Sequence, residues 1–282
     1  MWIWYELRSY REKVLAVLLL VATLLAGYGV WIETGAIGLG RWQVQLTLLS
    51  VLGLSVMWIW LCGSLSIYYY RRAEKSRGLV SLEMEQSRLA EFDLRNVPNL
   101  GEMQKINLGS NSLRTLDLLP LSGSANLVEL ILYFNNLDNI DLFPLSECVN
   151  LEYLDLSANK LTQLDLKPLS SCTRLNAINL GGNRTRVIDL ESLSSLSELK
   201  ILTIDDMDLK DVDLSPLANC PRLEFLKMND NMIESVDITP LYECRSLTDF
   251  EVDNIRLTTT TNRPIEEWPE GIRKHRKRIR II

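Results

Sequence analysis

Aspartates recur at intervals of 24 residues along this chain of 282 residues, and regularly spaced carboxylates can bind cations. Carboxylates stacked at about 4.8 Å repel by roughly 1 kcal/mol even in water, so another interaction must offset the repulsion. Aspartate commonly accepts hydrogen bonds from backbone N–H groups of a following turn, and we expect that role here. Calcium needs six or more oxygen ligands, so we predict no metal site. The column comprises Asp93, Asp117, Asp141, Asp165, Asp189, Asp213 and Asp237.

Thiols form a second column with the same register, at Cys148, Cys172, Cys220 and Cys244. They could chelate metal or sense redox state, but buried structural cysteine is the simpler interpretation. With Cys62 they make an odd number without a CxxC pair, which favours reduced thiols. The single histidine, His275, argues against histidine-dependent catalysis and histidine-ligated zinc. We therefore predict that the protein is not an enzyme and has no cofactor.

The elements that carry these columns are repeats, in register at Leu79, Met103, Leu127, Leu151, Leu175, Leu199, Leu223 and Leu247. The clearest unit, residues 151–174, reads LEYLDLSANKLTQLDLKPLSSCTR, with apolar residues at positions 1, 4, 6, 11, 14, 16 and 19. The LxL alternation predicts a short strand, and strands stacked about 4.8 Å apart form a parallel sheet. Self-similarity at a fixed period is typical of a solenoid.

This LxxLxLxxNxL pattern, followed by LDLxPLxxC, resembles the leucine-rich repeat family over residues 79–262, in seven full units and a partial eighth. The LDLxPL part is also similar to the DIxPL turn of internalin-type bacterial repeats, although two extra residues separate Asn from Pro here. Only the repeat class carries over, and no internalin activity is implied. The resemblance implies an α/β solenoid with parallel strands on the concave face and short helical or 3₁₀ turns on the convex face.

An asparagine ladder typical of the family is matched at position 9, by Asn111, Asn135, Asn159, Asn183 and Asn231. An inward amide at this position can bond the turning backbone of its own and the neighbouring coil. Met207 interrupts the ladder in mid-array, so we expect that coil to bulge. The last unit has Trp268 where others have cysteine, which is typical of a cap that closes the open core.

Two uncharged runs precede the repeats, from Val14 to Ile32 and from Val44 to Tyr70. The first has 19 residues and reaches roughly 28 Å as a helix, close to the thickness of the hydrocarbon core of a bilayer. We predict an α-helical transmembrane hairpin of two spans over residues 14–70, in contact with the lipid bilayer. It follows a basic N-terminal segment, 1–13, and precedes a basic juxtamembrane linker, 71–78.

Lysine and arginine predict how the hairpin is oriented. Three precede the first span, four follow the second, and only Arg41 lies between them, so both termini of this integral membrane protein should be cytoplasmic. Neither span holds an Asp, Glu, Lys, Arg or His, so anchoring is a simpler role than transport.

Positions 3, 5, 7 and 8 of each unit face the concave side of a solenoid, where repeat proteins present an extended binding surface. Residues 79–262 carry 15 Lys/Arg against 29 Asp/Glu, so this surface favours a protein or basic peptide and disfavours nucleic acid. Exposed aromatic residues beside charges are typical of binding hot spots. The predicted partner-binding residues are Glu129, Ile131, Tyr133, Phe134, Tyr153, Asp155, Asp205, Asp206, Phe225, Lys227, Asp230, Asp249, Glu251 and Asp253.

The C-terminal cap and polybasic tail, residues 263–282, carry 7 Lys/Arg against 3 Asp/Glu. The tail could rest on anionic lipid, bind nucleic acid, contact the acidic repeats of its own chain, or be a solvated charge run. For the whole chain we predict a membrane-anchored scaffold that recruits a protein partner at the cytoplasmic membrane surface. The alternatives are a regulatory or sensor subunit whose hairpin docks with another membrane protein, and a surface receptor or adhesion protein if the topology is inverted.

Overall fold

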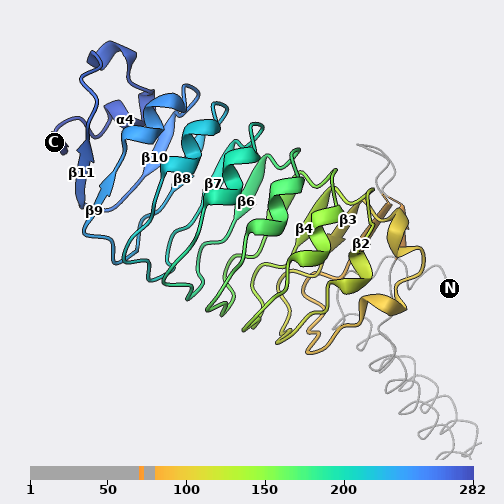
Figure 1. Ribbon diagram of the computed structural model, residues 1–282. Coiled ribbons are helices and arrows are strands. Elements are labelled where there is room, and N and C mark those ends of the chain that lie inside the picture. The colour runs from red at the N-terminus through yellow and green to blue at the C-terminus, as the bar shows by residue number, and fades with distance from the viewer. Residues whose placement is uncertain (1–69, 73–79) are drawn as a thin grey trace, which may run out of the picture. The chain divides into compact units, whose positions relative to one another are not determined.

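The computed structural model describes residues 70–72 and 80–282, which belong to one structural unit, Tyr69–Ile282 (Figure 1). The predicted transmembrane hairpin lies outside these residues, apart from Tyr70, as does most of the predicted linker. None of the helices that the structure describes combines the length with the apolar character that a bilayer crossing requires.

A nine-stranded sheet runs the length of the repeats, with one short strand from each of the eight coils and one, β1, from the residues before them. Apart from the first pair, neighbouring strands are parallel and lie in register at the 24-residue period, as in Leu130↔Leu154↔Ile178. Figure 1 shows these strands side by side along one face. In sheet order the strands are β1 Tyr70–Arg72, β2 Val80–Glu83, β3 Lys105–Asn107, β4 Glu129–Ile131, β5 Tyr153–Asp155, β6 Ala177–Asn179, β7 Ile201–Thr203, β8 Phe225–Lys227 and β10 Asp249–Glu251.

Short 3₁₀ helices form the opposite, convex side of the coils. Proline lies at the first or second position of η3, η4, η5, η7 and η8, where its missing N–H costs little. The segments are η1 Leu94–Asn96, η2 Leu100–Glu102, η3 Leu119–Leu121, η4 Phe143–Glu147, η5 Lys167–Ser171, η6 Glu191–Ser195, η7 Ser215–Asn219 and η8 Thr239–Glu243. The parallel-strand, leucine-rich-repeat fold that the sequence predicts is confirmed for this unit.

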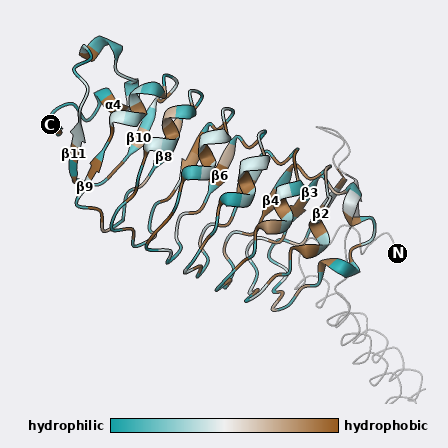
Figure 2. Cartoon of the chain, in the orientation of Figure 1, coloured by the Kyte–Doolittle hydropathy of each residue, from teal (hydrophilic) through white to brown (hydrophobic). Residues whose placement is uncertain are grey.

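The core is a stack of leucine rows between the sheet and the 3₁₀ helices. In the clearest unit, Leu154, Leu156, Leu161 and Leu169 are fully buried, and the same positions are buried in the neighbouring coils. Figure 2 shows hydrophobic and hydrophilic residues alternating along each coil. Because each coil buries its apolar side chains only against its neighbours, stability comes from stacking.

Buried asparagines hold the turn that follows each strand. The side-chain amide of Asn159 donates to the carbonyl of Leu156 in its own coil and to that of Leu132 in the preceding coil, at 3.0 Å each. Its Oδ1 accepts from the backbone N–H of Leu137, also in the preceding coil, at 3.1 Å. The ladder repeats these bonds at Asn111, Asn135 and Asn183, so one side chain satisfies backbone groups of two coils.

The aspartate column caps the convex segments. In all seven units the Oδ1 of the aspartate accepts the backbone N–H two residues later, at 2.9–3.0 Å. Hydrogen bonds from the side chain and backbone of Ser215 lower the pKa of Asp213. Within the described residues no group of three or more metal-ligating side chains is placed to hold an ion.

The four described cysteines are buried, and none of them forms a disulfide. Each sulfur donates to the carbonyl of the leucine 27 residues earlier, for example Cys172 to Leu145 at 3.2 Å. Burial raises the pKa of Cys148 and Cys244 to about 12 and that of Cys172 and Cys220 to about 11. These thiols therefore stay protonated and unreactive at neutral pH.

The expected bulge at Met207 is not found in the sheet, because β6, β7 and β8 keep the regular register across this coil. Met207 is fully buried, so its thioether fills the interior. Oδ1 of Asn231, one coil on, accepts the N–H groups of both Met207 and Leu209. The irregularity is confined to the turns, where Arg186 and Asp208 have φ of 44° and 58°.

The predicted linker also differs from the structure at its start. Tyr70, Arg71 and Arg72 form β1, which pairs antiparallel with β2, so these residues belong to the sheet and do not lead freely away from it. Pairing gives the first parallel strand a neighbour on its outer side, which shields an edge that would otherwise be open to association.

A cap of different construction ends the solenoid. β9 Ser235–Asp237, β11 Arg256–Thr259 and β12 Ile279–Ile281 form a second, three-stranded sheet, and η9 Ile265–Glu267 and α4 Glu270–Arg273 complete it. The Trp268 ring packs edge-on against Tyr242, with ring centroids 5.4 Å apart.

The basic tail folds back on the last strand of the long sheet. Lys274 forms an ion pair with Asp249 at 2.7 Å, and His275 Nε2 lies 2.8 Å from the carbonyl of Phe250. Arg278 donates to the carbonyl of Asp253. Of the alternatives that the sequence left open, the structure thus contains contact with the acidic repeats of the same chain.

Replacing Asn159 by alanine should lower the free energy of unfolding of the purified full-length chain by about 2–4 kcal/mol, because buried backbone groups in two coils lose their partner. Chemical unfolding followed by circular dichroism measures the change. Asn139→Ala, at an exposed position, is the control and should change stability by less than about 0.5 kcal/mol. Equal stability of the two variants would contradict the role of the ladder.

Candidate functional site

The concave face consists of the side chains at positions 3, 5, 7 and 8 of each coil, on the strands β2 to β8 and β10 and the turns that follow them. Because side chains alternate along a strand, positions 3 and 5 point away from the leucine core while position 4 is buried in it. All fourteen predicted partner-binding residues lie on these strands and turns, between β4 and the turn after β10. They differ in how far each side chain is exposed and in whether it is already bound by another group of the chain.

An aromatic pair stands out on this face. Phe134 is 65% exposed and packs edge-on against Tyr133, with ring centroids 5.9 Å apart. The Tyr133 ring lies over Gly109 of the preceding coil, where any Cβ would come within 2.5 Å of it. The Tyr133 hydroxyl donates to Glu85, two coils away, and this hydrogen bond raises the pKa of Tyr133. The tyrosine is thus fixed, while the phenylalanine is presented to solvent.

The backbone at Phe134 is left-handed, with φ of 49°. Position 8 takes this conformation in seven coils, where it is occupied by Gln86, Ser110, Phe134, Ala158, Gly182, Asp206 and Asp230. Glycine has no Cβ penalty there, and aspartate tolerates the conformation better than a bulky residue does. Phenylalanine at position 134 therefore lowers the stability of the fold, and the local backbone does not require it.

Asp155 departs from the prediction that it binds a partner. It lies on the concave face but is only 6% exposed, and its carboxylate is already occupied. It accepts from the Tyr153 hydroxyl at 2.9 Å, from the backbone and side chain of Ser157, and from Asn179. Burial together with Asp155 raises the pKa of Tyr153. Asp155 therefore organises its neighbours instead of offering a free charge.

Two lysines neutralise part of the acidic surface. Lys105 lies between Glu83 and Glu129, with its amino group 3.3 and 3.4 Å from their carboxylates. Burial lowers the pKa of Lys105, but the two carboxylates together outweigh this effect and raise it. Lys227 forms an ion pair with Asp205 at 2.8 Å, and this hydrogen bond raises the pKa of Lys227.

Towards the C-terminal end of the concave face, some carboxylates are bound by other groups of the chain and others are exposed to solvent. Asp249 is bound by Lys274, and the carboxylate of Asp253 accepts the backbone N–H of Asn231. Asp206, Asp230 and Glu251 are exposed and no ion pair is seen for them among the described residues, although Asp230 accepts a hydrogen bond from the side-chain amide of Asn229. These three carry the negative charge that a partner would meet.

Two residues of a less polar row at position 3, Tyr153 and Phe225, are among the predicted partner-binding residues. Tyr153, Ala177, Ile201 and Phe225 are register partners on β5, β6, β7 and β8. Ile201 is 41% exposed, which is unusual for a large aliphatic residue in the middle of a sheet. The 24-residue register alone would have found the row, because it places these four residues at the same position of successive units.

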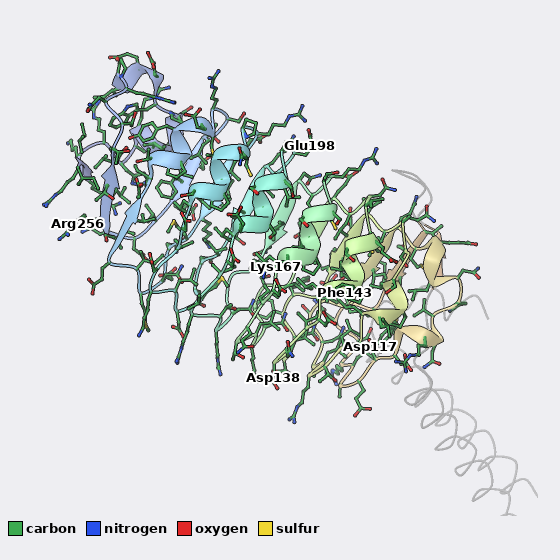
Figure 3. The ribbon with its side chains drawn as sticks, viewed as in Figure 1. Asp117, Asp138, Phe143, Lys167, Glu198 and Arg256 are labelled. Carbon is green, nitrogen blue, oxygen red and sulfur yellow. The ribbon has the colours of Figure 1, made fainter. Side chains whose placement is uncertain are left out.

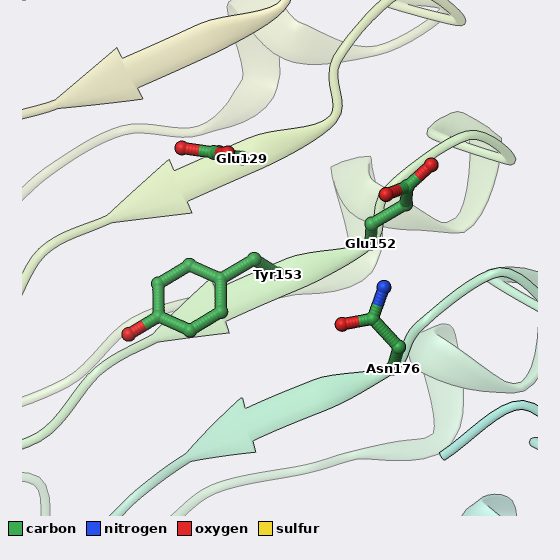
Figure 4. A pocket seen from close by; sticks show the side chains of 4 residues that line it. All are labelled: Glu129, Glu152, Tyr153 and Asn176. Atoms are coloured by element: carbon green, nitrogen blue, oxygen red, sulfur yellow. The ribbon is translucent and has the colours of Figure 1, made fainter. Parts of the chain in front are cut away.

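A shallow hollow of about 360 Å³ lies at one end of this row (Figure 4). Glu129 and Tyr153 line it from β4 and β5, and Glu152 and Asn176 line it from the positions that precede β5 and β6. The hollow joins two carboxylates, an aromatic ring and an amide, a chemistry that suits a basic side chain.

The convex side has its own exposed apolar residues. Phe143, at the start of η4, is 69% exposed, and Leu119, at the same position of η3, is 61% exposed. Figure 3 shows Phe143 and Lys167 on successive coils, and Lys167 occupies the equivalent position of η5. Phe143 is therefore an internal comparison for Phe134, equally exposed but outside the concave face.

Comparison with known proteins agrees with this architecture. Residues 125–184 and 149–209 match the sequence family described as Leucine rich repeat. No curated protein matches the chain in sequence. An internalin (inlF) structure from Listeria monocytogenes is 28% identical with a TM-score of 0.51, and the match covers 66% of this chain and 52% of that one. The chain thus spans about half the length of that structure.

Two further solved structures are similar. Internalin C2 (inlC2) from Listeria monocytogenes is 24% identical, with a TM-score of 0.52 and coverage of 72% of this chain and 80% of that one, which supports the fold. The ectodomain of the plant membrane receptor kinase GASSHO1/SCHENGEN3 from Arabidopsis thaliana, solved in complex with Casparian Strip Integrity Factor 2, is 27% identical. Its TM-score is 0.52, and the match covers 57% of this chain and 20% of that one.

Replacing Phe134 by asparagine should raise the free energy of unfolding by about 1 kcal/mol, because asparagine tolerates the left-handed backbone better than phenylalanine. A thermal unfolding midpoint higher by about 2–4 °C is the expected readout for a domain of this size. Phe143→Asn is the matched control, since φ is not positive at that residue, and it should not stabilise. A lower midpoint for Phe134→Asn would contradict the strain argument.

Proposed function

We propose that this leucine-rich-repeat chain binds a protein partner through its concave face. The observation that carries the proposal is Phe134, a large aromatic side chain exposed on that face at a position where the backbone favours small residues. Strain that the fold does not need is retained where a residue serves recognition. Exposed aromatic residues supported by a fixed neighbour, here Tyr133, are typical of interface hot spots.

The charge of the face favours a basic partner. The two lysines on β3 and β8 are already bound to carboxylates, whereas Asp206, Asp230 and Glu251 are exposed. Complementary charge increases the rate of encounter and disfavours like-charged surfaces, including nucleic acid. The complex of the Arabidopsis receptor ectodomain supports a binding role for this repeat class.

The proposal extends to the membrane through the sequence. The apolar runs within residues 14–70 would hold the repeats at the bilayer, and the lysine and arginine distribution would place them in the cytoplasm. In the tail, Arg276, Lys277 and Arg280 are exposed and form no ion pair within the described residues, so they are available to anionic lipid headgroups. The chain would then act as a membrane-anchored scaffold.

Photoreactive p-benzoyl-phenylalanine placed at Phe134 of the full-length chain should cross-link a protein partner in cells. The same group at Phe143 is the control, because it is similarly exposed on the convex side. We expect a discrete cross-linked species from position 134, identified by mass spectrometry, and at least about tenfold less from position 143. Equal yields from both positions, or none from position 134, would contradict recognition by the concave face.

A further inference from the structure

The position-3 row gives the concave face an amphipathic character that runs along the solenoid axis. Tyr153, Ala177, Ile201 and Phe225 stand side by side across four parallel strands and form one apolar line about 14 Å long, in which Ala177 is buried, Ile201 is exposed, and Tyr153 and Phe225 are half-buried. The charged pair of Lys105 and Glu129 precedes this row on β3 and β4, and Asp249 follows it on β10. A partner that covers the row must supply apolar side chains at matching intervals.

Acidic groups lie on both sides of the row. On one side, Glu152 lines the hollow next to Tyr153, whereas Glu129, the other carboxylate of the hollow, lies in line with the row as the register partner of Tyr153. On the other, Asp206 and Asp230 project from the turns after β7 and β8 and are exposed. The complementary surface is therefore an apolar stripe flanked by basic residues.

The backbone of the sheet restricts the form of that partner. From β2 to β8 every strand is paired on both sides, so the face that carries the row offers no free line of backbone donors and acceptors. An extended peptide laid across the strands would leave its own backbone groups unpaired, whereas a helix satisfies them internally. Side chains on one helix face lie about 5–6 Å apart, close to the 4.8 Å between strands, while same-face side chains of an extended chain lie about 6.8 Å apart.

We propose that the position-3 row, Tyr153, Ala177, Ile201 and Phe225, is the binding site for a basic amphipathic helix of the protein partner. This inference rests on the proposed function and specifies the class of ligand. The helix lies along the solenoid axis with its apolar stripe on the row. Its lysine or arginine side chains reach Glu152 in the hollow on one side and Asp206 and Asp230 on the other.

Designed peptides test the inference on the full-length chain in nanodiscs of zwitterionic lipid, with empty nanodiscs as the blank. The probe is a helix of leucine and lysine with leucines at i, i+3, i+4 and i+7. The first comparison peptide has the same composition in scrambled order, and the second carries glutamate in place of lysine. We expect the leucine–lysine helix to bind at least about tenfold more tightly than either comparison peptide.

Single substitutions then locate the site. Ile201→Asn should weaken binding of the helix by about tenfold, because it removes the most exposed aliphatic group of the row. Val187→Asn is the matched control, since Val187 is a still more exposed aliphatic residue in a turn outside the strands, and it should leave binding unchanged. Circular dichroism spectra that match the unsubstituted chain exclude misfolding as the cause.

The inference is overturned if the scrambled peptide binds as tightly as the helix, or if Ile201→Asn and Val187→Asn have the same effect. Neither result decides the proposed function, because cross-linking from position 134 uses the natural partner and a different group on the concave face. Conversely, the cross-link could be absent while the helix binds tightly and Ile201→Asn weakens that binding. This result would contradict the role of Phe134 and support the helix-binding site.

Discussion

Every coil of this solenoid must turn its backbone inward at the end of its strand, and the buried polar groups of that turn must be bonded. One asparagine side chain does this for two coils at once, as Asn159 shows by bonding Leu156 in its own coil and Leu132 and Leu137 in the coil before. The amide therefore fixes the distance and the register between neighbours. Rows of equivalent side chains, including those of the concave face, exist because this register is constant.

The same turn sets a condition on the binding surface. Where the chain leaves the strand, position 8 adopts positive φ in seven coils, and small or polar residues occupy it in most of them. Phe134 satisfies the geometry at a cost and gains exposure on the concave face. Seven coils thus share this backbone conformation, and one of them places a large aromatic side chain on it. Next to it, Gly109 makes room for the ring of Tyr133.

Periodicity in the sequence was enough to predict the strands, the 3₁₀ segments and the faces to which each column belongs, because these follow from local pattern. It did not predict which charges are free, because that depends on partners 22 to 48 residues away. Asp155 accepts a hydrogen bond from Asn179, 24 residues away, and Tyr133 donates to Glu85, 48 residues away. The repeat pattern places Ile201 on the concave face, but not its 41% exposure, which depends on the side chains of the neighbouring coils.

The most direct test of the account is the side of the membrane on which the concave face lies. In a Cys62→Ser background, the four buried thiols are unreactive, so a single cysteine introduced at exposed Asp206 reports on this face alone. The account predicts that an impermeant thiol reagent labels this cysteine only after cells are lysed. Labelling of intact cells would place the face outside and contradict a cytoplasmic scaffold.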